Sequence, residues 1–474
     1  MIGYVCIAIA IGIATVILLY QAYGFGLNKK GQVVQDGLLF VSSTPGGAEI
    51  YLNGTDQQKT TNTRLSLVSG QYNMKLTRNG YRDWERKVNI LGGFVDRFDY
   101  PFLIPKDLTT ANITPYDTLP ASASQSPDHR WVLVQHAGTD SFDLYDLKNP
   151  KNPAAALQVP ANVITTGANQ TYEMLEWAND NQHVLIKHTY DSGKYEFIML
   201  DVKNPDQSVN LSTALGATPT TMTLINKKYD QYYLYDSAAQ TLSSASLGTP
   251  TPKLVLDHVL AYKSYSDNMI LYASSQTADG TVAVKLLDGS KTYTLRTLAA
   301  GTTYLLDLTQ YSGSWYVVVG AGSEDKVYIY KNPMSQLDSG KSVLVPVYIL
   351  RVPAASYVSF SPNARFIVAE NGTQFGVYDA EYPGGYVYDT KLPVDAPQPH
   401  ANWMDGNHLD YVSGGKLVMF DFDEGNLQTL MPAAPNYVPF FSPDYKFVDV
   451  IAAPTAQDVK AELTSTSLRT PADQ

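Results

Sequence analysis

The sequence predicts an all-β protein behind a single N-terminal helix. Three observations lead to this prediction. Short β-rich stretches separated by turn residues fill the chain from about residue 37, a turn-and-strand pattern recurs from about residue 110, and no long capped helix is evident beyond the first 22 residues. The length of 474 residues favours two or three domains. A hydrophobic content of 44% with 17% charged residues is typical of a packed chain.

The first element is an uncharged stretch from Ile2 to Tyr20. As a helix it would be about 29 Å long, close to the roughly 30 Å thickness of the hydrocarbon core of a bilayer. We therefore predict a retained transmembrane anchor over residues 1–22 and a linker over 23–36. A cleaved signal peptide is one alternative, but the stretch is long and no convincing cleavage site follows it. A buried helix of a soluble protein is the other alternative.

The second element, residues 37–105, contains short strands joined by turns. The runs "LLFVSS" and "AEIYLNG" flank a Pro-Gly-Gly corner at 45–47, and the Asn-Gly pair at 79–80 is a strong hairpin signal. The stretches "SSTPGGAEIYLNG" and "LSLVSGQYNMKLTRNGY" resemble the PEGA domain, a small β-sandwich-like module of prokaryotic surface proteins. Gly46 stands where the family motif has Glu. The resemblance implies a spacer or an envelope-contact module without an active site.

The remaining chain repeats one unit from about residue 110 onward. Its clearest copies begin with a Ser-Pro turn followed by an apolar strand, at Ser126, Ser361 and Ser442. A second strand then ends at one of these residues: Asp146, Asp201, Asp236, Asp288, Lys331, Asp379 and Asp421. Their mean spacing is about 46 residues, within the period of four-stranded propeller blades. We expect each strand-end aspartate to bond nearby backbone and fix its hairpin turn, rather than to take part in catalysis.

This pattern resembles the WD40-like repeats of TolB-type propellers, whose units carry a Ser-Pro-Asp-Gly turn. The fourth residue here is His129, Ala364 or Tyr445 instead of Gly. The resemblance implies a β-propeller over residues 106–470, and the strand-end residues favour eight blades, with seven as the alternative. We expect the tail from Ala456 to add a strand that closes the ring with the segment near 111–123, because closure removes exposed sheet edges.

No recognisable motif for catalysis, metal binding or cofactor binding occurs in the sequence. It has no Gly-x-Ser-x-Gly elbow, no His-Glu-x-x-His motif and no Gly-rich phosphate loop. The odd separation of His183 and His188 would place them on opposite faces of a strand. The stretch "DFDEGN" at 421–426 is better explained as a hairpin turn than as a calcium loop. The aromatic stretches from Tyr311 and Tyr382 are expected to pack in loops, although they could line a recognition surface. We predict a non-enzyme with no catalytic residue, no metal and no cofactor.

Charge and cysteine content restrict the partners and the compartment. A net charge of −11 argues against a nucleic-acid partner. The single cysteine, Cys6, lies in the apolar stretch, so the folded part has no thiol, which is compatible with an oxidising exterior. Lys29 and Lys30 favour a cytoplasmic body by the positive-inside rule. The anchor, the missing thiols and the family resemblance favour export, and we predict an extracytoplasmic body.

The sequence as a whole predicts a single-pass cell-surface protein attached to the membrane through Ile2 to Tyr20. Its propeller is expected to be a non-catalytic binding or scaffolding module for a protein or a cell-wall polysaccharide. Two other functions stay open, because a fold does not by itself establish a function. One is an envelope hydrolase with its active site in the propeller channel. The other is a regulatory or sensory subunit of a membrane complex.

Overall fold

The fold is that of a computed structural model of the chain, which describes residues 2–22, 24–27, 33–277, 280–341, 343–453 and 460–473. These residues divide into two units. The first unit contains the residues up to Thr109 together with those from Ser467 onward. The second unit extends from Thr110 to Thr466.

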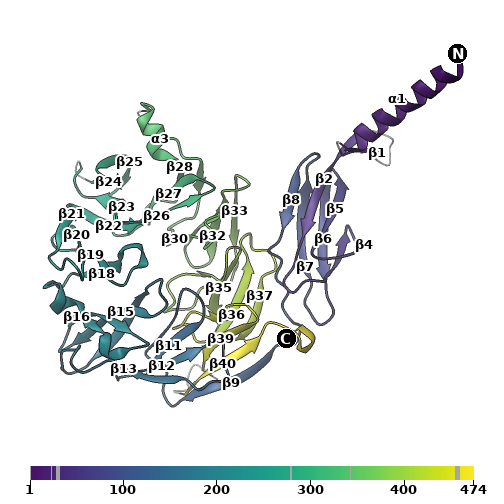
Figure 1. The fold of residues 1–474 in the computed structure, drawn as a ribbon. Coiled ribbons are helices and arrows are strands. Elements are labelled where there is room, and N and C mark those ends of the chain that lie inside the picture. Colours follow the sequence, from purple (N-terminus) through teal and green to yellow (C-terminus); the bar gives the residue numbers. More distant parts are fainter. Residues whose placement is uncertain are drawn as a thin grey trace. The chain divides into compact units, whose positions relative to one another are not determined.

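The N-terminal helix α1 (Ile2–Ala22) contains no charged residue (Figure 1). Large apolar side chains are exposed along it, from Ile7, which is 58% exposed, to Leu18, which is 65% exposed. In the part of the chain that the structure describes, no helix combines the length and the apolar character that crossing a bilayer requires. The helix predicted from Ile2 to Tyr20 is present, and its membrane span stays a prediction. Lys29 and Lys30 lie outside the described residues.

The first unit has two four-stranded sheets among its described residues. In one, β1 (Phe25–Leu27), β2 (Val33–Val41) and β5 (Thr63–Val68) are neighbours, and β8 (Val95–Phe98) pairs with β2 in parallel. The other has the order β4 (Thr55–Thr60), β3 (Glu49–Leu52), β6 (Gly70–Thr77) and β7 (Trp84–Ile90). The predicted Asn-Gly turn at 79–80 joins β6 to β7, with Gly80 at a φ of 81°. Buried side chains of both sheets form the core, among them Leu39, Val41, Ile50, Leu76, Trp84 and Ile90.

The residues from Ser467 onward belong to the first unit, whereas the propeller was predicted to extend to residue 470. The hydroxyl of Tyr81 accepts a hydrogen bond from the backbone N–H of Thr470 (3.0 Å) and donates one to Asp473 (2.8 Å). Arg78 forms an ion pair with the same carboxylate. The end of the chain is therefore bonded to the β6–β7 hairpin.

The second unit consists of eight four-stranded sheets over its described residues, the number that the strand-end residues favoured. The sheets follow one another around a common centre in Figure 1. The first four contain β10 (Ser122–Gln125), β11 (Trp131–Gln135), β12 (Ser141–Asp146) and β13 (Ala155–Gln158); β14 (Thr171–Trp177), β15 (His183–Tyr190), β16 (Lys194–Asp201) and β17 (Val209–Asn210); β18 (Thr221–Leu224), β19 (Gln231–Asp236), β20 (Thr241–Ser246) and β21 (Lys253–Leu256); and β22 (Val259–Ser264), β23 (Met269–Ser274), β24 (Thr281–Asp288) and β25 (Lys291–Ala299). The next three contain β26 (Tyr304–Tyr311), β27 (Ser314–Ala321), β28 (Val327–Lys331) and β29 (Tyr348–Leu350); β30 (Tyr357–Phe360), β31 (Phe366–Glu370), β32 (Gln374–Asp379) and β33 (Gly384–Asp389); and β34 (Asn402–Trp403), β35 (His408–Ser413), β36 (Lys416–Asp421) and β37 (Gln428–Pro432).

The eighth sheet joins the two ends of the second unit. Its order is β38 (Phe440–Phe441), β39 (Phe447–Ala452), β40 (Ala461–Ser467) and β9 (Thr109–Tyr116). The hydroxyls of Thr110 and Thr466 lie 2.9 Å apart across the last pair of strands. The predicted closure by the tail is confirmed for β40, and residues 456–459 of that tail lie outside the described residues. Because β9 and β40 pair with each other, neither of these strands leaves an open edge on the side that faces the other.

Side-chain contacts connect the first strand of each sheet to the first strand of the next sheet, or to the turn after it. The indole N–H of Trp177 on β14 donates to Ser124 on β10 (3.0 Å). Gln125 on β10 donates to the carbonyl of Phe441 on β38 (2.8 Å), so the first sheet is bonded to the last. The other contacts are Glu176–Leu224 (2.8 Å), Thr223–Tyr262 (2.9 Å), Lys263–Asp307 (3.4 Å), Asp307–Phe360 (3.2 Å), Ser359–Trp403 (3.1 Å) and Met404–Tyr445 (3.4 Å). This circular series is the arrangement of a propeller-like fold.

Helical segments beyond α1 are short within the described residues. They are the α-helices α2 (Leu211–Ala214) and α3 (Pro333–Asp338) and the 3₁₀ turns η1 (Pro205–Gln207), η2 (Ile225–Lys227) and η3 (Pro471–Asp473). Asn210 caps α2, where its side chain accepts the N–H of Thr213.

Candidate functional site

Each Ser-Pro turn of the second unit is held by the hydroxyl of its serine. Ser126 donates to a carboxylate oxygen of Asp128 (2.6 Å) and accepts the backbone N–H of Trp131 (2.9 Å). Ser361 and Ser442 make the corresponding two bonds, although Ser361 donates to the amide oxygen of Asn363 instead of a carboxylate. The fourth residue of each turn has a φ between 52° and 61°: His129, Ala364 and Tyr445. Glycine adopts this left-handed conformation at the lowest cost, so each of these three residues carries a conformational penalty.

Five of the six strand-end aspartates accept hydrogen bonds from nearby groups, as predicted, whereas the side chain of Asp288 accepts none within the described part of the chain. Asp146 accepts two bonds from the guanidinium of Arg130 (3.0 and 2.8 Å) and one from the N–H of Lys148 (3.1 Å). The bonds from Arg130 lower the pKa of Asp146 to about 2. Asp379 and Arg365 repeat this bidentate pair (3.0 and 2.7 Å). Two other strand-end aspartates, Asp201 and Asp236, accept hydrogen bonds from the backbone N–H groups two and three residues further along the chain. These carboxylates hold hairpin turns.

His183 and His188 have different partners, as their odd separation predicts. The Nδ1 of His183 lies 2.6 Å from Asp180, and its ring stacks on Tyr229 at a centroid distance of 4.1 Å. His188 is buried, with its Nδ1 2.9 Å from Glu196. Over the residues that the structure describes, no group of three or more His, Cys, Asp or Glu side chains is placed to hold a metal ion. Both histidines are therefore part of the packing of the second sheet.

A buried histidine that the sequence analysis did not single out occupies the corresponding place in the seventh sheet. The Nδ1 of His408 lies 2.8 Å from Asp405, and its Nε2 lies 3.4 Å from Asp421. Burial opposes the charged imidazole, but the two carboxylates outweigh it and raise the pKa of His408 to about 10. The stretch 421–426 forms the predicted turn, in which the N–H of Asp421 donates to the carbonyl of Gly425 (2.8 Å).

In the two aromatic stretches, some rings pack inside the protein and others are exposed to solvent. Tyr316 on β27 is buried, and the hydroxyl of Tyr388 on β33 donates to the carbonyl of Phe422 (3.0 Å), so both rings pack inside the protein, but from strands rather than from the predicted loops. Tyr382, however, is 47% exposed, with the guanidinium of Arg365 5.2 Å from its ring centroid. The stretch that begins at Tyr382 therefore also presents an aromatic ring to solvent.

Exposed and half-buried aromatic side chains lie on or beside turns at one end of successive sheets. In antiparallel sheets, the turn after the first strand and the turn after the third lie at the same end. Tyr229, 41% exposed, and Tyr265, 44% exposed, lie on such turns in the third and fourth sheets. Trp315 packs edge-on against Tyr265 at 4.9 Å. We call the following residues the aromatic rim: Tyr229, Tyr265, Tyr311, Trp315 and Tyr382.

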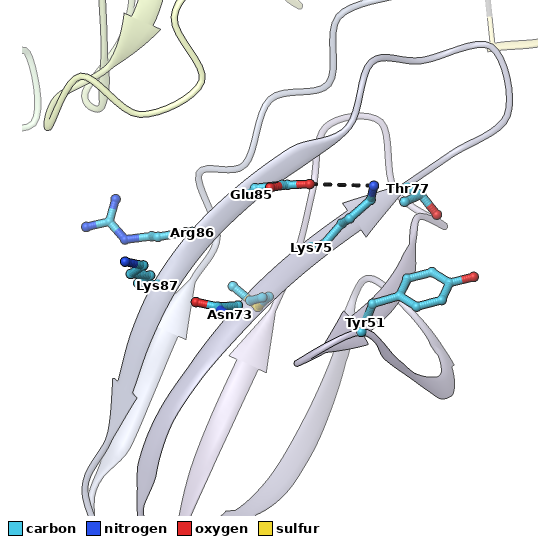
Figure 2. A pocket seen from close by; sticks show the side chains of 9 residues that line it. Tyr51, Asn73, Lys75, Thr77, Glu85, Arg86 and Lys87 are labelled. Atoms are coloured by element: carbon cyan, nitrogen blue, oxygen red, sulfur yellow. Dashed lines mark ion pairs between the residues drawn. The ribbon is translucent and has the colours of Figure 1, made fainter.

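The first unit carries a polar hollow on the outward side of β3, β6 and β7 (Figure 2). Cross-strand neighbours form rows there. Tyr51, Lys75 and Glu85 make one row, and Asn73 and Lys87 make the next. The hollow has a volume of about 830 Å³, and an adjoining hollow of about 410 Å³ shares Asn73 and Lys87 with it. We call these residues the polar face: Tyr51, Gln71, Asn73, Lys75, Thr77, Glu85, Lys87 and Asn89.

Ion pairs neutralise part of the polar face. The ammonium of Lys75 lies 2.5 Å from Asp83 and 3.5 Å from Glu85, the pair drawn in Figure 2. The hydroxyl of Tyr51 donates to Glu49 (3.0 Å). Four side chains make no hydrogen bond or ion pair with the described part of the chain: Gln71, Asn73, Lys87 and Asn89. This face was not predicted from the sequence, although polar residues alternate in "QYNMKLT" and "WERKVNI".

Comparisons with known proteins agree with the first unit at the level of the domain family. Residues 36–102 match the PEGA domain, which confirms the resemblance for that stretch. No curated protein sequence matches the chain.

Solved propeller structures are similar to the chain at low identity. The Dos1 propeller is 10% identical with a TM-score of 0.44, and the match covers 76% of this chain and 95% of that one. The β-propeller domain of Cps50 (Swd1) from Myceliophteria thermophila is 9% identical with a TM-score of 0.42, covering 76% and 99%. An uncharacterised protein of Listeria monocytogenes EGD-e is 11% identical with a TM-score of 0.41, covering 70% and 93%. At these values the likeness carries no argument, and the propeller-like description rests on the sheet order and inter-sheet contacts of the chain itself.

Proposed function

We propose that this chain is a membrane-attached, extracytoplasmic binding protein without catalytic activity, whose propeller-like region is of the TolB type and binds a protein partner through the aromatic rim. The observation that carries the proposal is the series of partly exposed aromatic rings on successive sheets, with Tyr265 and Tyr382 the most exposed. Tyrosine and tryptophan are enriched at protein interfaces because each buries a large area with few rotatable bonds. The histidine and aspartate groups suited to chemistry have structural partners instead, as at His183, His408 and Asp146.

Site-specific photo-crosslinking in intact cells tests the binding surface. A crosslinking residue is placed at Tyr265, at Tyr382 or at Leu254, a matched apolar position that is 58% exposed on the outer strand β21. The two rim positions should yield one shared protein adduct that is absent at Leu254. Equal adducts at all three positions, or none at the rim, would contradict the proposal.

The membrane part of the proposal is supported by α1, which is uncharged and exposes apolar side chains such as Ile13 and Leu18 to water. Removing such surface from water is favourable by about 25 cal/mol per Å². The full chain should stay in the membrane pellet after carbonate extraction, and protease added to intact cells should cleave its body. Release by carbonate would contradict membrane attachment, and protection of the body in intact cells would contradict the extracytoplasmic location.

A further inference from the structure

We propose that the polar face of the first unit binds an uncharged polysaccharide strand that lies along β6 and β7. This site shares no residue with the aromatic rim, so either proposal can be correct without the other.

The shape of the polar face suits an extended chain. The two hollows share Asn73 and Lys87 and therefore form one continuous depression along the strands. On β6 the depression extends from Gln71 to Thr77. Six residue steps of about 3.3 Å make this roughly 20 Å, a length that exceeds a single sugar ring. A linear polymer fits this depression better than a small molecule.

The side chains of the polar face that have no partner carry groups that can bind hydroxyls. Cross-strand pairing sets Gln71 beside Asn89, and Asn73 beside Lys87. Each amide side chain both donates and accepts hydrogen bonds, as each sugar hydroxyl does. Within the described part of the chain these four side chains have no partner, so a ligand does not have to break bonds within the protein to reach them. The backbone N–H of Asn73 donates to the side chain of Asn53 (2.8 Å), which fixes the strand under the depression.

The charge of the polar face disfavours a polyanion. Lys75 is neutralised by Asp83 and Glu85, and the guanidinium of Arg86, which also lines the hollow, lies over the rings of Phe98 and Tyr100. Lys87 is then the cation of the hollow without a partner among the described residues. A polyanion would meet one free ammonium and several carboxylates, whereas an uncharged chain meets mainly amides. A protein partner is also a poorer fit, because the fully buried centre of a protein interface is usually apolar. Met74, the apolar residue among those that line the hollow, is 1% exposed.

Affinity electrophoresis of the full chain in mild detergent tests the proposal. The native gels contain dextran, mannan or xylan as uncharged probes, or polygalacturonate as the anionic probe. At least one uncharged polymer should retard the chain. The double substitution Asn73→Ala with Lys87→Ala should weaken that retardation by at least about tenfold, because two hydrogen bonds to the ligand are lost. Gln57→Ala on the exposed edge strand β4 is the control and should leave it unchanged.

A second variant keeps the test independent of folding. Gln71→Ala with Asn89→Ala removes the other pair of amides, and substitutions at exposed positions such as these leave the stability of a protein nearly unchanged. It should weaken retardation by the same polymer, while circular dichroism shows an unchanged melting temperature. Retardation only by polygalacturonate, retardation by no polymer, or equal retardation of both double variants and the original chain would overturn the proposal.

Discussion

The fourth residue of each Ser-Pro turn is not glycine, but its backbone has a conformation that glycine adopts at lower cost. His129 and Tyr445 pack edge-on against each other with their rings 5.5 Å apart, so their contact offsets part of that cost. Ala364 has only a methyl group and lies at a φ of 61°. An L-residue loses about 1–2 kcal/mol in this region. Ala364 is therefore the residue at which relief of strain is measured most cleanly.

Ala364→Gly should raise the free energy of unfolding of the second unit by about 1 kcal/mol, after allowance for the greater freedom of glycine in the unfolded chain. Denaturant unfolding followed by tryptophan fluorescence measures the change. Ala369→Gly on the buried strand β31 is the matched control and should lower the stability, because glycine weakens a strand interior. A loss of stability in both variants would show that the turn is not strained.

Glu370 is a second residue that lowers the stability of the folded chain, in this case when its buried carboxyl group ionises. Its side chain is fully buried at the end of β31. One carboxylate oxygen accepts the N–H of Ala401 (2.9 Å), and the other has no partner among the described residues. Burial raises the pKa of Glu370 from 4.5 to about 8. Its stabilising contribution is therefore complete below pH 4.5 and is lost as the pH rises through 8.

Glu370→Gln should remove this pH dependence. Between pH 5 and pH 8 the original chain should lose stability relative to the variant by up to about 1.4 kcal/mol per pH unit. Thermal unfolding of both chains at the two pH values measures the difference. The glutamine oxygen can still accept the bond from Ala401, so the fold is expected to persist. Glu173→Gln on an exposed position of β14 should follow the original chain at both pH values, and parallel curves for Glu370→Gln would contradict the assignment.

At the scale of elements, two of the strand-end hairpins contain the same arginine–aspartate ion pair, buried to different extents. The side chains of the Arg365–Asp379 pair are 14% and 2% exposed, whereas those of the Arg130–Asp146 pair are 37% and 12% exposed. Removing one partner of a buried pair leaves an uncompensated charge, which costs far more than the loss of an exposed pair. The two hairpins therefore offer a comparison with matched chemistry.

Asp379→Asn should lower the free energy of unfolding of the second unit by about 3 kcal/mol, and Asp146→Asn by about 1 kcal/mol. Denaturant midpoints of the two variants at one pH give the comparison. The ion pair between Arg365 and Glu381 (2.7 Å) persists in the first variant and limits its loss. Equal losses would mean that burial of the guanidinium does not control the cost.

The hairpins were predictable from the sequence because their signals are local. The Ser-Pro turns, the strand-end aspartates and the Asn-Gly turn at 79–80 each use residues close together in the chain. The polar face was not predictable in this way, since the pairing of Asn73 with Lys87 depends on cross-strand register. The contact between Trp177 and Ser124 depends in the same way on how neighbouring sheets align. Spacing within one strand does not reveal either.

At the scale of the whole molecule, the chain passes between its two units twice. It leaves the first unit near Thr109 and returns near Ser467, where β9 and β40 are neighbours in one sheet. The returning residues complete the core of the first unit, since Leu468 is fully buried and the guanidinium of Arg469 lies 5.0 Å over the ring of Phe102. The first unit is therefore complete only when the last residues of the chain are present.

Asp473 is the residue through which this dependence is best measured. Its side chain is 17% exposed, and it accepts bonds from Tyr81 and Thr470 and pairs with Arg78. Burial opposes its charge, but these partners outweigh it and lower the pKa of Asp473, so its stabilising contribution is present near neutral pH and is lost as the pH falls through that lowered pKa. Asp473→Asn should destabilise the first unit by about 1–3 kcal/mol at pH 7, with the two chains converging in acid.

Hydrogen-exchange mass spectrometry of the full chain separates the two units in this experiment. Peptides from β6 and β7 should lose protection in Asp473→Asn, whereas peptides from β31 to β36 should keep it, because those strands belong to the second unit. Glu462→Gln on β40 is the matched carboxylate-to-amide control and should leave both regions unchanged. Loss of protection in both units would mean that they unfold as one cooperative body, and unchanged protection in β6 and β7 would mean that the C-terminal residues do not stabilise the first unit.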